Sequence, residues 1–178
     1  MTEPLHAIVR PVAAVDAPTD RARFEQMLNR HHRRLRRLVA AVIADPNRVD
    51  DVLQEGYYRA YRRLPRRFAN DAHEATWLYR VVYRCCLDEL RARRRRRETP
   101  SDHVHLSLVG DGGQSRVELE EAFRALPTRD RAVLLLVGVL DLDYASAAAV
   151  LGVPRGTLAW RLAEARARFR SALGAADD

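Results

Sequence analysis

A short stretch of polar residues offers the first candidates for chemistry: Asp50, Asp51, Gln54 and Glu55. Asp51 and Glu55 are four residues apart, so they would share one face of a helix. An enzyme would use Asp50, Asp51 and Glu55 as metal ligands, with His31 or His32 nearby. No HExxH motif, spaced Cys/His set or Gly-rich phosphate loop accompanies them. A solvated acidic helix face is the simpler interpretation, and we expect no catalytic residue, no metal and no cofactor.

Aromatic residues and arginines alternate in the stretch Trp77–Arg84, and six arginines follow within residues 91–97. Aromatic faces stack on unpaired bases, while guanidinium groups bind the phosphate backbone. Core packing is the alternative for Trp77, Tyr79 and Tyr83, and a solvated helix end is the alternative for the arginine run. The pattern favours a surface that binds nucleic acid.

A helix-turn-helix pattern lies between Asp143 and Phe169. Asp143 is placed to cap a short apolar helix, Gly152 to take the left-handed position after it, and Pro154 to begin the next helix. The second helix of such a pair fits the major groove of DNA. Residues 155–170 carry five arginines and one glutamate, as a helix that approaches phosphates requires. An ordinary helical hairpin is the alternative.

The basic charge is concentrated in the first half of the chain. The sequence contains no lysine, and all 31 basic residues are arginine. Residues 21–98 hold 21 arginines and ten acidic residues, whereas residues 99–178 hold nine arginines and eleven acidic residues. A GC-rich genome explains the replacement of lysine by arginine, but it does not explain this asymmetry. Because arginine makes bidentate contacts to phosphates and bases, the first half is expected to contact nucleic acid.

The elements that position these residues are all predicted to be helices. Apolar residues recur at helical spacing from Asp20, a candidate N-cap, to Val42. A second helix runs from about Val49 to Leu64, and a polar loop follows it to about Ala75. No alternating β-pattern of useful length occurs. We therefore predict an all-α chain of two small helical domains, with a flexible tail at 1–19, a first domain at 20–97, a linker at 98–116 and a second domain at 117–178.

The cysteine and hydropathy patterns exclude other classes of protein. The only cysteines, Cys85 and Cys86, are adjacent, so no disulfide framework is expected. No run reaches the roughly 18 apolar residues that span a bilayer, and residues 1–20 lack the pattern of a signal peptide. We expect a cytoplasmic protein without membrane insertion.

Three segments, in order and at suitable spacing, resemble motifs of bacterial RNA polymerase sigma factors of the extracytoplasmic-function type. Val49–Tyr61 is similar to their AEDLVQETFLRAW segment, and Trp77–Arg91 is similar to the motif that begins with Trp-Leu and ends with Asp-x-x-Arg. Leu126–Arg166 is similar to their Leu-Pro motif and the helix-turn-helix after it. The resemblance covers residues 24–173 and implies a region 2-like helical bundle followed by a region 4-like helix-turn-helix domain.

The resemblance also implies roles for particular residues. Core RNA polymerase would be bound by the acidic helix face of Asp50, Asp51, Gln54 and Glu55. The −10 promoter element would be opened and read by Trp77, Arg80, Arg84, Cys85, Asp88 and Arg91. The −35 element would be read by Arg155, Thr157, Trp160, Arg161 and Arg166. The implied function is a promoter-specificity subunit with core RNA polymerase, promoter DNA and an anti-sigma factor as partners.

The sequence departs from the family pattern in each DNA-reading segment. Cys85 replaces an asparagine, and Ser146 replaces a glutamate that would complete a capping box with Asp143. Ala159, Trp160 and Glu164 stand where the family is more polar or basic, so we expect a short or degenerate −35 preference. Trp160 would either pack inward or contact a thymine methyl group.

A stand-alone helix-turn-helix regulator with a helical sensing domain is the alternative function. It accounts for residues 117–173 but leaves the segments Val49–Tyr61 and Trp77–Arg97 without a role. A regulator would bind duplex DNA alone, whereas a sigma factor generally needs the polymerase.

Overall fold

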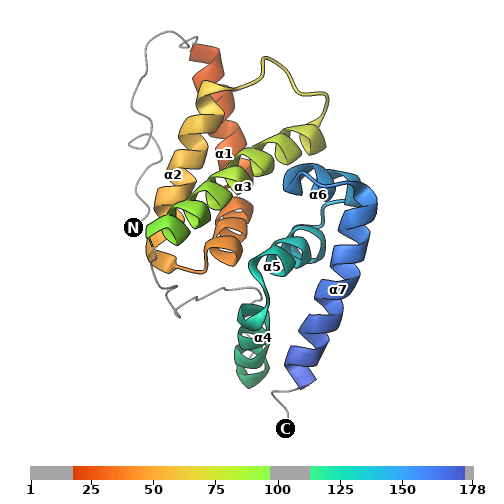
Figure 1. Cartoon of the computed structure of the whole chain (residues 1–178). Helices are drawn as coiled ribbons and strands as arrows, with labels where there is room; N and C mark the ends of the chain where they lie inside the picture. Colours follow the sequence, from red (N-terminus) through yellow and green to blue (C-terminus); the bar gives the residue numbers. More distant parts are fainter. Residues whose placement is uncertain (1–17, 97–112, 175–178) are drawn as a thin grey trace.

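The computed structural model describes residues 18–96 and 113–174, and every regular element in these ranges is a helix (Figure 1). The first half contains α1 (Pro18–Ile43), α2 (Pro46–Arg62) and α3 (Asp71–Arg96). The second half contains α4 (Gly113–Ala125), α5 (Thr128–Leu134), the π-helical turn η2 (Leu135–Val139), α6 (Tyr144–Leu151) and α7 (Arg155–Gly174). The predicted all-α fold with two helical domains is confirmed. Most of the predicted tail and linker lies outside the described residues.

Helices α1 to α4 all begin earlier than the sequence pattern predicts. α1 begins at Pro18, which places Asp20 in its first turn, so the prediction that Asp20 is the N-cap is wrong. A carboxylate in the first turn is still favourable because the N-terminal end of a helix is positive. α4 begins at Gly113 and therefore includes residues 113–116, which were predicted as the end of the linker.

The loop before α3 is shorter than predicted. α3 begins at Asp71 and not after Ala75. The side chain of Asn70 accepts a hydrogen bond from the backbone N–H of His73 (2.8 Å), which is the geometry of an N-cap. This local capping signal begins the helix before the apolar periodicity becomes visible.

The axes of α2 and α3 approach closely at Gly56. A Cβ atom added to Gly56 would lie 2.9 Å from Cγ2 of Val82 and 3.5 Å from its Cα. Val82 is fully buried, so its side chain has no free space to move into. The crossing of α2 and α3 therefore depends on the absence of a side chain at this position.

We expect Gly56→Ala to lower the free energy of unfolding by about 1–3 kcal/mol, because the added methyl group overpacks the α2–α3 contact. Gly138→Ala is the matched control, since no atom lies within 4 Å of a Cβ added to Gly138. Urea unfolding of both variants measures the difference. Equal stability of Gly56→Ala and the wild-type chain would contradict the close crossing.

The helix-turn-helix predicted from the sequence is present in the second half. Asp143 is the N-cap of α6 and accepts a hydrogen bond from the backbone N–H of Ser146 (3.0 Å). Gly152 ends α6 with a φ of 69°, a left-handed conformation that favours glycine. Pro154 precedes α7, and its carbonyl accepts from the N–H of Leu158 (3.0 Å). These local interactions set the position of α7 relative to α6.

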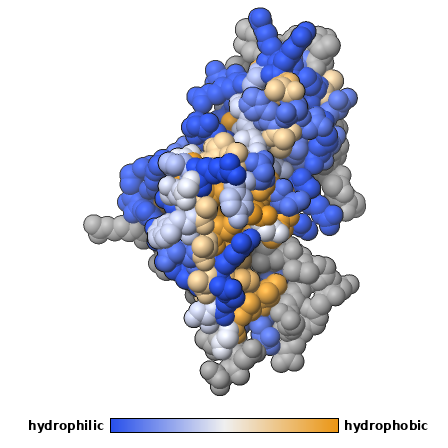
Figure 2. All heavy atoms as spheres, turned by 90° about the vertical axis from the view of Figure 1, so that its right-hand side faces the viewer, coloured by the Kyte–Doolittle hydropathy of each residue, from blue (hydrophilic) through white to orange (hydrophobic). Residues whose placement is uncertain are grey.

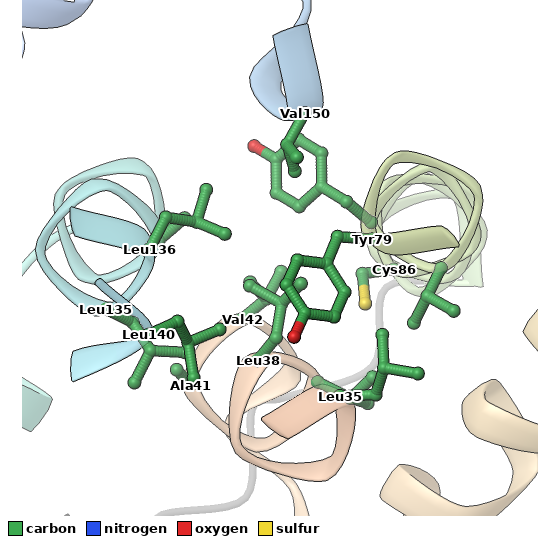
Figure 3. Packing of buried hydrophobic residues seen from close by; sticks show 14 of the residues in the cluster. Leu35, Leu38, Ala41, Val42, Tyr79, Cys86, Leu135, Leu136, Leu140 and Val150 are labelled. Carbon is green, nitrogen blue, oxygen red and sulfur yellow. The ribbon is translucent and has the colours of Figure 1, made fainter. Parts of the chain in front are cut away.

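The two halves pack against each other, which the sequence did not indicate. α1 contacts α5 and η2, and α3 contacts α6 (Figure 1). Buried apolar residues of both halves form one cluster. Figure 3 shows Leu38 and Val42 of α1 in this cluster together with Leu136 of η2 and Val150 of α6. A core shared in this way joins the two predicted domains into one body.

Candidate polymerase and promoter interfaces

The predicted polymerase-binding residues lie together on the exposed side of α2, which we call the acidic face: Asp50, Asp51, Gln54 and Glu55. The opposite side of α2 is buried. Arg36 of α1 pairs with Asp50, and Arg59 donates from Nε to Glu55 (2.6 Å). Exposed ion pairs of this kind contribute little to stability. The carboxylates therefore remain available to basic residues of a partner.

Three of the predicted −10 residues, Arg84, Asp88 and Arg91, line one hollow of about 360 Å³ between α2 and α3, which we call the basic hollow. Asp88 accepts hydrogen bonds from Arg59 (2.7 Å) and from Arg91 (3.2 Å). The hydrogen bonds with Asp88, and then with Glu55, raise the pKa of the Arg59 guanidinium, which stays protonated. These pairs hold the arginine side chains at the rim of the hollow.

Sequence reasoning missed two residues of the basic hollow, Arg59 and Arg63. The sequence pattern places Arg59 on the polar face of the helix, four positions after Glu55. Arg63 follows the end of α2, and no local sequence pattern indicates its position. Val81 and Leu87 supply apolar lining. Arginines around a partly apolar hollow suit a nucleotide, since guanidinium groups bind its phosphate and apolar groups contact its base.

Cys85 lies outside the basic hollow, although it shares a second hollow with Asp88. It is 4% exposed, and it lines this second hollow of about 320 Å³ together with Asp51 and Glu55 of the acidic face. Burial raises the pKa of its thiol. The structure therefore does not bring Cys85 together with Arg84 in the basic hollow.

Trp77 and Arg80 do not line the basic hollow, because they lie closer to the start of α3 than the residues that line it. Trp77 is half-buried against Phe68 of the α2–α3 loop, with ring centroids 5.3 Å apart, and Arg80 is exposed. Tyr79 and Tyr83 are buried, and burial raises the pKa of both hydroxyl groups. Figure 3 shows Tyr79 directed into the apolar cluster. The interpretation of these two tyrosines as base-stacking residues is wrong, because they belong to the core.

The arginine run at the end of α3 has two roles. Arg94–Arg96 are exposed, as a nucleic-acid surface requires. Arg93 is buried, pairs with Asp45 (3.3 Å) and donates to the carbonyl oxygen of Ile43 (3.4 Å). Arg93 therefore joins α3 to the turn between α1 and α2. Arg97 lies outside the described residues.

The predicted −35 residues are on α7: Arg155, Thr157, Trp160, Arg161 and Arg166. Arg155 and Arg166 are exposed. Trp160 is 62% exposed, which excludes the inward packing considered from the sequence. Figure 2 views the side of the molecule on which α7 lies and shows hydrophobic residues among hydrophilic ones. Arg161 is half-buried, and its charge opposes the rise in the pKa of Tyr83 that burial causes.

Two departures from the family pattern have local partners. Ser146 donates from its hydroxyl to Asp143 (2.6 Å), and this bond lowers the pKa of Asp143. This bond joins two side chains and is not the capping-box bond, in which the side chain of the third helical residue accepts from the backbone N–H of the N-cap. Glu164 pairs with Arg168 (2.8 Å), which also binds Asp130 of α5. Glu164 thus supports the packing of α7 on α5.

The alternative of a metal site has no support in residues 18–96 and 113–174. No group of three or more His, Cys, Asp and Glu side chains in these ranges could hold a metal ion. His31 lies buried beside Glu74 (3.5 Å) and Tyr79 (3.4 Å), where it packs α1 against α3. In the same ranges, no helix has both the length and the apolar character to cross a membrane.

Two family models match the chain: Sigma-70 region 2 over residues 27–96 and Sigma-70 region 4 over residues 116–169. SigM of Mycobacterium tuberculosis is 34% identical over 158 residues, which cover 87% of this chain and 79% of SigM. SigC of the same species is 36% identical over 131 residues, covering 71% of this chain and 70% of SigC. The chain belongs to the extracytoplasmic-function sigma factors, the non-catalytic subunits that direct RNA polymerase to promoters.

Two solved structures share the fold. The sigma factor RpoE in complex with the anti-sigma factor NepR from Bartonella quintana has a TM-score of 0.73 and 21% identity, covering 85% of this chain and 97% of RpoE. CnrH in complex with the cytosolic domain of CnrY has a TM-score of 0.62 and 26% identity, covering 87% of this chain and 90% of CnrH. The region 2 match of the first half decides against a stand-alone regulator, which gave that half no role.

Proposed function

We propose that this sigma factor uses three separate surfaces to bind the polymerase and the two promoter elements. The acidic face of α2 docks on core RNA polymerase. α3 holds the opened −10 element through Trp77, Arg80, Arg84, Asp88 and Arg91, and α7 reads the −35 element through Arg155, Thr157, Trp160, Arg161 and Arg166. Cys85 is omitted from the −10 surface because it is buried away from the basic hollow. A protein that acts on polymerase and promoter DNA works in the cytoplasm.

The observation that carries the proposal is the placement of two surfaces of opposite charge on neighbouring sides of α2 and α3. The acidic face suits a basic protein surface, and the basic hollow suits a nucleic-acid strand. Arg59 connects them, since it binds Glu55 of the acidic face and Asp88 of the basic hollow. A polymerase docked on α2 would thus have the −10 strand beside it.

Run-off transcription tests this proposal. The purified chain is mixed with core RNA polymerase and a pool of genomic promoter fragments, and transcripts are sequenced. We expect the chain to co-purify with the core enzyme and to produce transcripts that neither the core enzyme nor the chain produces alone. A folded chain that neither binds the core enzyme nor adds transcripts would refute the assignment.

We further propose that an anti-sigma factor binds this chain. The two structural neighbours were solved with such partners, NepR for RpoE and the cytosolic domain of CnrY for CnrH. The chain shares their fold over 85% and 87% of its length. Affinity capture from the native host tests the proposal, and the expected result is a co-purified protein that suppresses the run-off transcripts.

A short or degenerate −35 preference that depends on Arg155 and Arg161 is the expected result of a randomised-promoter selection. A bidentate arginine–guanine pair supplies roughly 1–3 kcal/mol of discrimination against a wrong base. Ala159 and the Glu164 carboxylate donate no hydrogen bond, and Trp160 offers only apolar contact and one N–H, so few other donors remain. Arg170→Ala, at an exposed arginine near the end of α7, is the control. A long and strict consensus, or one unchanged by Arg161→Ala, would refute this interpretation.

A further inference from the structure

A loop of residues 63–70 joins α2 to α3 (Figure 1). Local hydrogen bonds hold its two ends: the N–H of Arg63 donates to the carbonyl oxygen of Ala60 (3.1 Å), and Asn70 caps α3. Pro65 lies between these ends and has no backbone N–H to donate. Side chains place this middle part of the loop.

Arg23 of α1 binds the middle of the loop. Its Nη1 donates to the carbonyl oxygen of Arg66 (2.8 Å), and its Nη2 donates to the carbonyl oxygen of Pro65. Asp20, one turn earlier on α1, also accepts from Nη1 (3.2 Å). The planar guanidinium presents its donors in a fixed fork, so it can bind two neighbouring carbonyl groups in one orientation. These acceptors all belong to the chain itself, and Arg23 therefore attaches the loop to α1.

The loop in turn supports a residue of the proposed −10 surface. Phe68 packs against Trp77 of α3, with ring centroids 5.3 Å apart and ring planes 51° apart. Arg23 and Phe68 line one hollow of about 280 Å³, together with Arg66 and Arg67 of the loop. A movement of the loop would therefore carry Phe68 away and expose the Trp77 ring to water.

We propose that Arg23 is a positioning residue for the −10 surface, which acts through the α2–α3 loop and Phe68 to hold Trp77. This inference rests on the proposed role of Trp77 at the opened −10 element. A loop and a ring that are already ordered lose less conformational entropy when a DNA strand binds. The acidic face does not include the loop, so binding to core polymerase is expected to be independent of Arg23.

The test uses two full-length variants that break this series of contacts at different steps. Arg23→Gln removes the guanidinium fork but preserves the helix propensity of α1. Phe68→Leu removes the ring that contacts Trp77 and keeps an apolar side chain. Arg21→Gln is the matched control, since Arg21 is exposed in the same turn of α1 and pairs with Glu25 of its own helix (3.1 Å). Circular dichroism and titration with core polymerase identify the variants that are folded and able to dock.

Tryptophan fluorescence of the free chain reports on the surroundings of Trp77. The sequence contains two tryptophans, so a Trp160→Phe background, used for this measurement alone, leaves Trp77 as the sole emitter. We expect Arg23→Gln and Phe68→Leu each to shift its emission to longer wavelength and to increase its quenching by acrylamide, because water reaches the ring. Arg21→Gln should leave both quantities unchanged.

Promoter opening is the functional readout, measured by permanganate reactivity at saturating polymerase with both tryptophans in place. We expect Arg23→Gln to lower the open fraction by about fivefold, which corresponds to about 1 kcal/mol. Because Arg23 acts through Phe68, the two substitutions together should lose no more than the larger single effect.

Unchanged Trp77 emission in folded Arg23→Gln would overturn the proposal, since any effect on opening would then come from a direct contact with DNA. Changed emission with unchanged opening would overturn the functional role of the contact, and additive losses in the double variant would overturn the shared path. A wild-type chain that opens no promoter would refute the proposed function, whereas the emission of the free chain would still decide whether Arg23 holds Trp77.

Discussion

Asp51→Arg combined with Glu55→Arg is expected to weaken binding to core RNA polymerase by about 100-fold or more. Both carboxylates are exposed on α2, and their present ion pairs, with Arg48 (4.0 Å) and Arg59 (2.6 Å), are surface pairs of little energetic value. Folding should therefore tolerate the change. Placing two cations against a basic partner surface costs several kcal/mol, and 100-fold corresponds to about 2.7 kcal/mol.

The control for this experiment reverses two exposed acidic residues elsewhere, by Glu25→Arg and Glu121→Arg. It changes the net charge by the same amount but leaves the acidic face intact. Binding is measured by fluorescence titration of labelled core enzyme, with helix content checked by circular dichroism. Equal loss in both double variants would indicate a general charge effect, and no loss in either would remove the acidic face from the proposal.

Features set by neighbouring residues could be predicted from the sequence. The helix-turn-helix of α6 and α7 is an example. Asp143, Gly152 and Pro154 shape it through hydrogen bonds and backbone conformations that involve residues only a few positions away. The apolar stripe of α7 is another, since Leu158 and Leu162 repeat at helical spacing and are buried as expected. Helix caps, left-handed backbone positions and apolar periodicity depend only on nearby residues, so the local sequence predicts them.

Features set by distant residues could not be predicted. Arg131 reaches Ala41 across 90 positions, and Arg93 reaches Ile43 across 50. Both were indistinguishable in the sequence from exposed arginines, since burial depends on which helices meet. The tyrosines of α3 show the same limit: Tyr79 and Tyr83 alternate with exposed arginines, yet α1 and the second half cover them. Residue type suggested a DNA surface there, and tertiary packing decided otherwise.

The second large effect is expected in promoter opening. Arg80→Ala combined with Arg84→Ala should reduce the fraction of open promoter by about 30-fold, while binding to core polymerase stays unchanged. Arg84 lines the basic hollow, and Arg80 is exposed on the same helix. Holding bases out of the duplex costs a few kcal/mol, and each hydrogen bond from a charged arginine to the unpaired strand contributes about 1.5–3 kcal/mol. Losing about 2 kcal/mol of this contribution corresponds to the stated factor.

Permanganate reactivity of unpaired thymines in the −10 element measures this effect on the assembled holoenzyme. Arg33→Ala, at an exposed arginine of α1, controls for the loss of positive charge. Trp77→Ala is a poorer probe because Trp77 packs on Phe68 and supports the α2–α3 loop. We expect low reactivity for the double variant at polymerase concentrations that saturate binding, and wild-type reactivity for Arg33→Ala. A parallel loss of polymerase binding would instead assign Arg80 and Arg84 to the folding or docking of region 2.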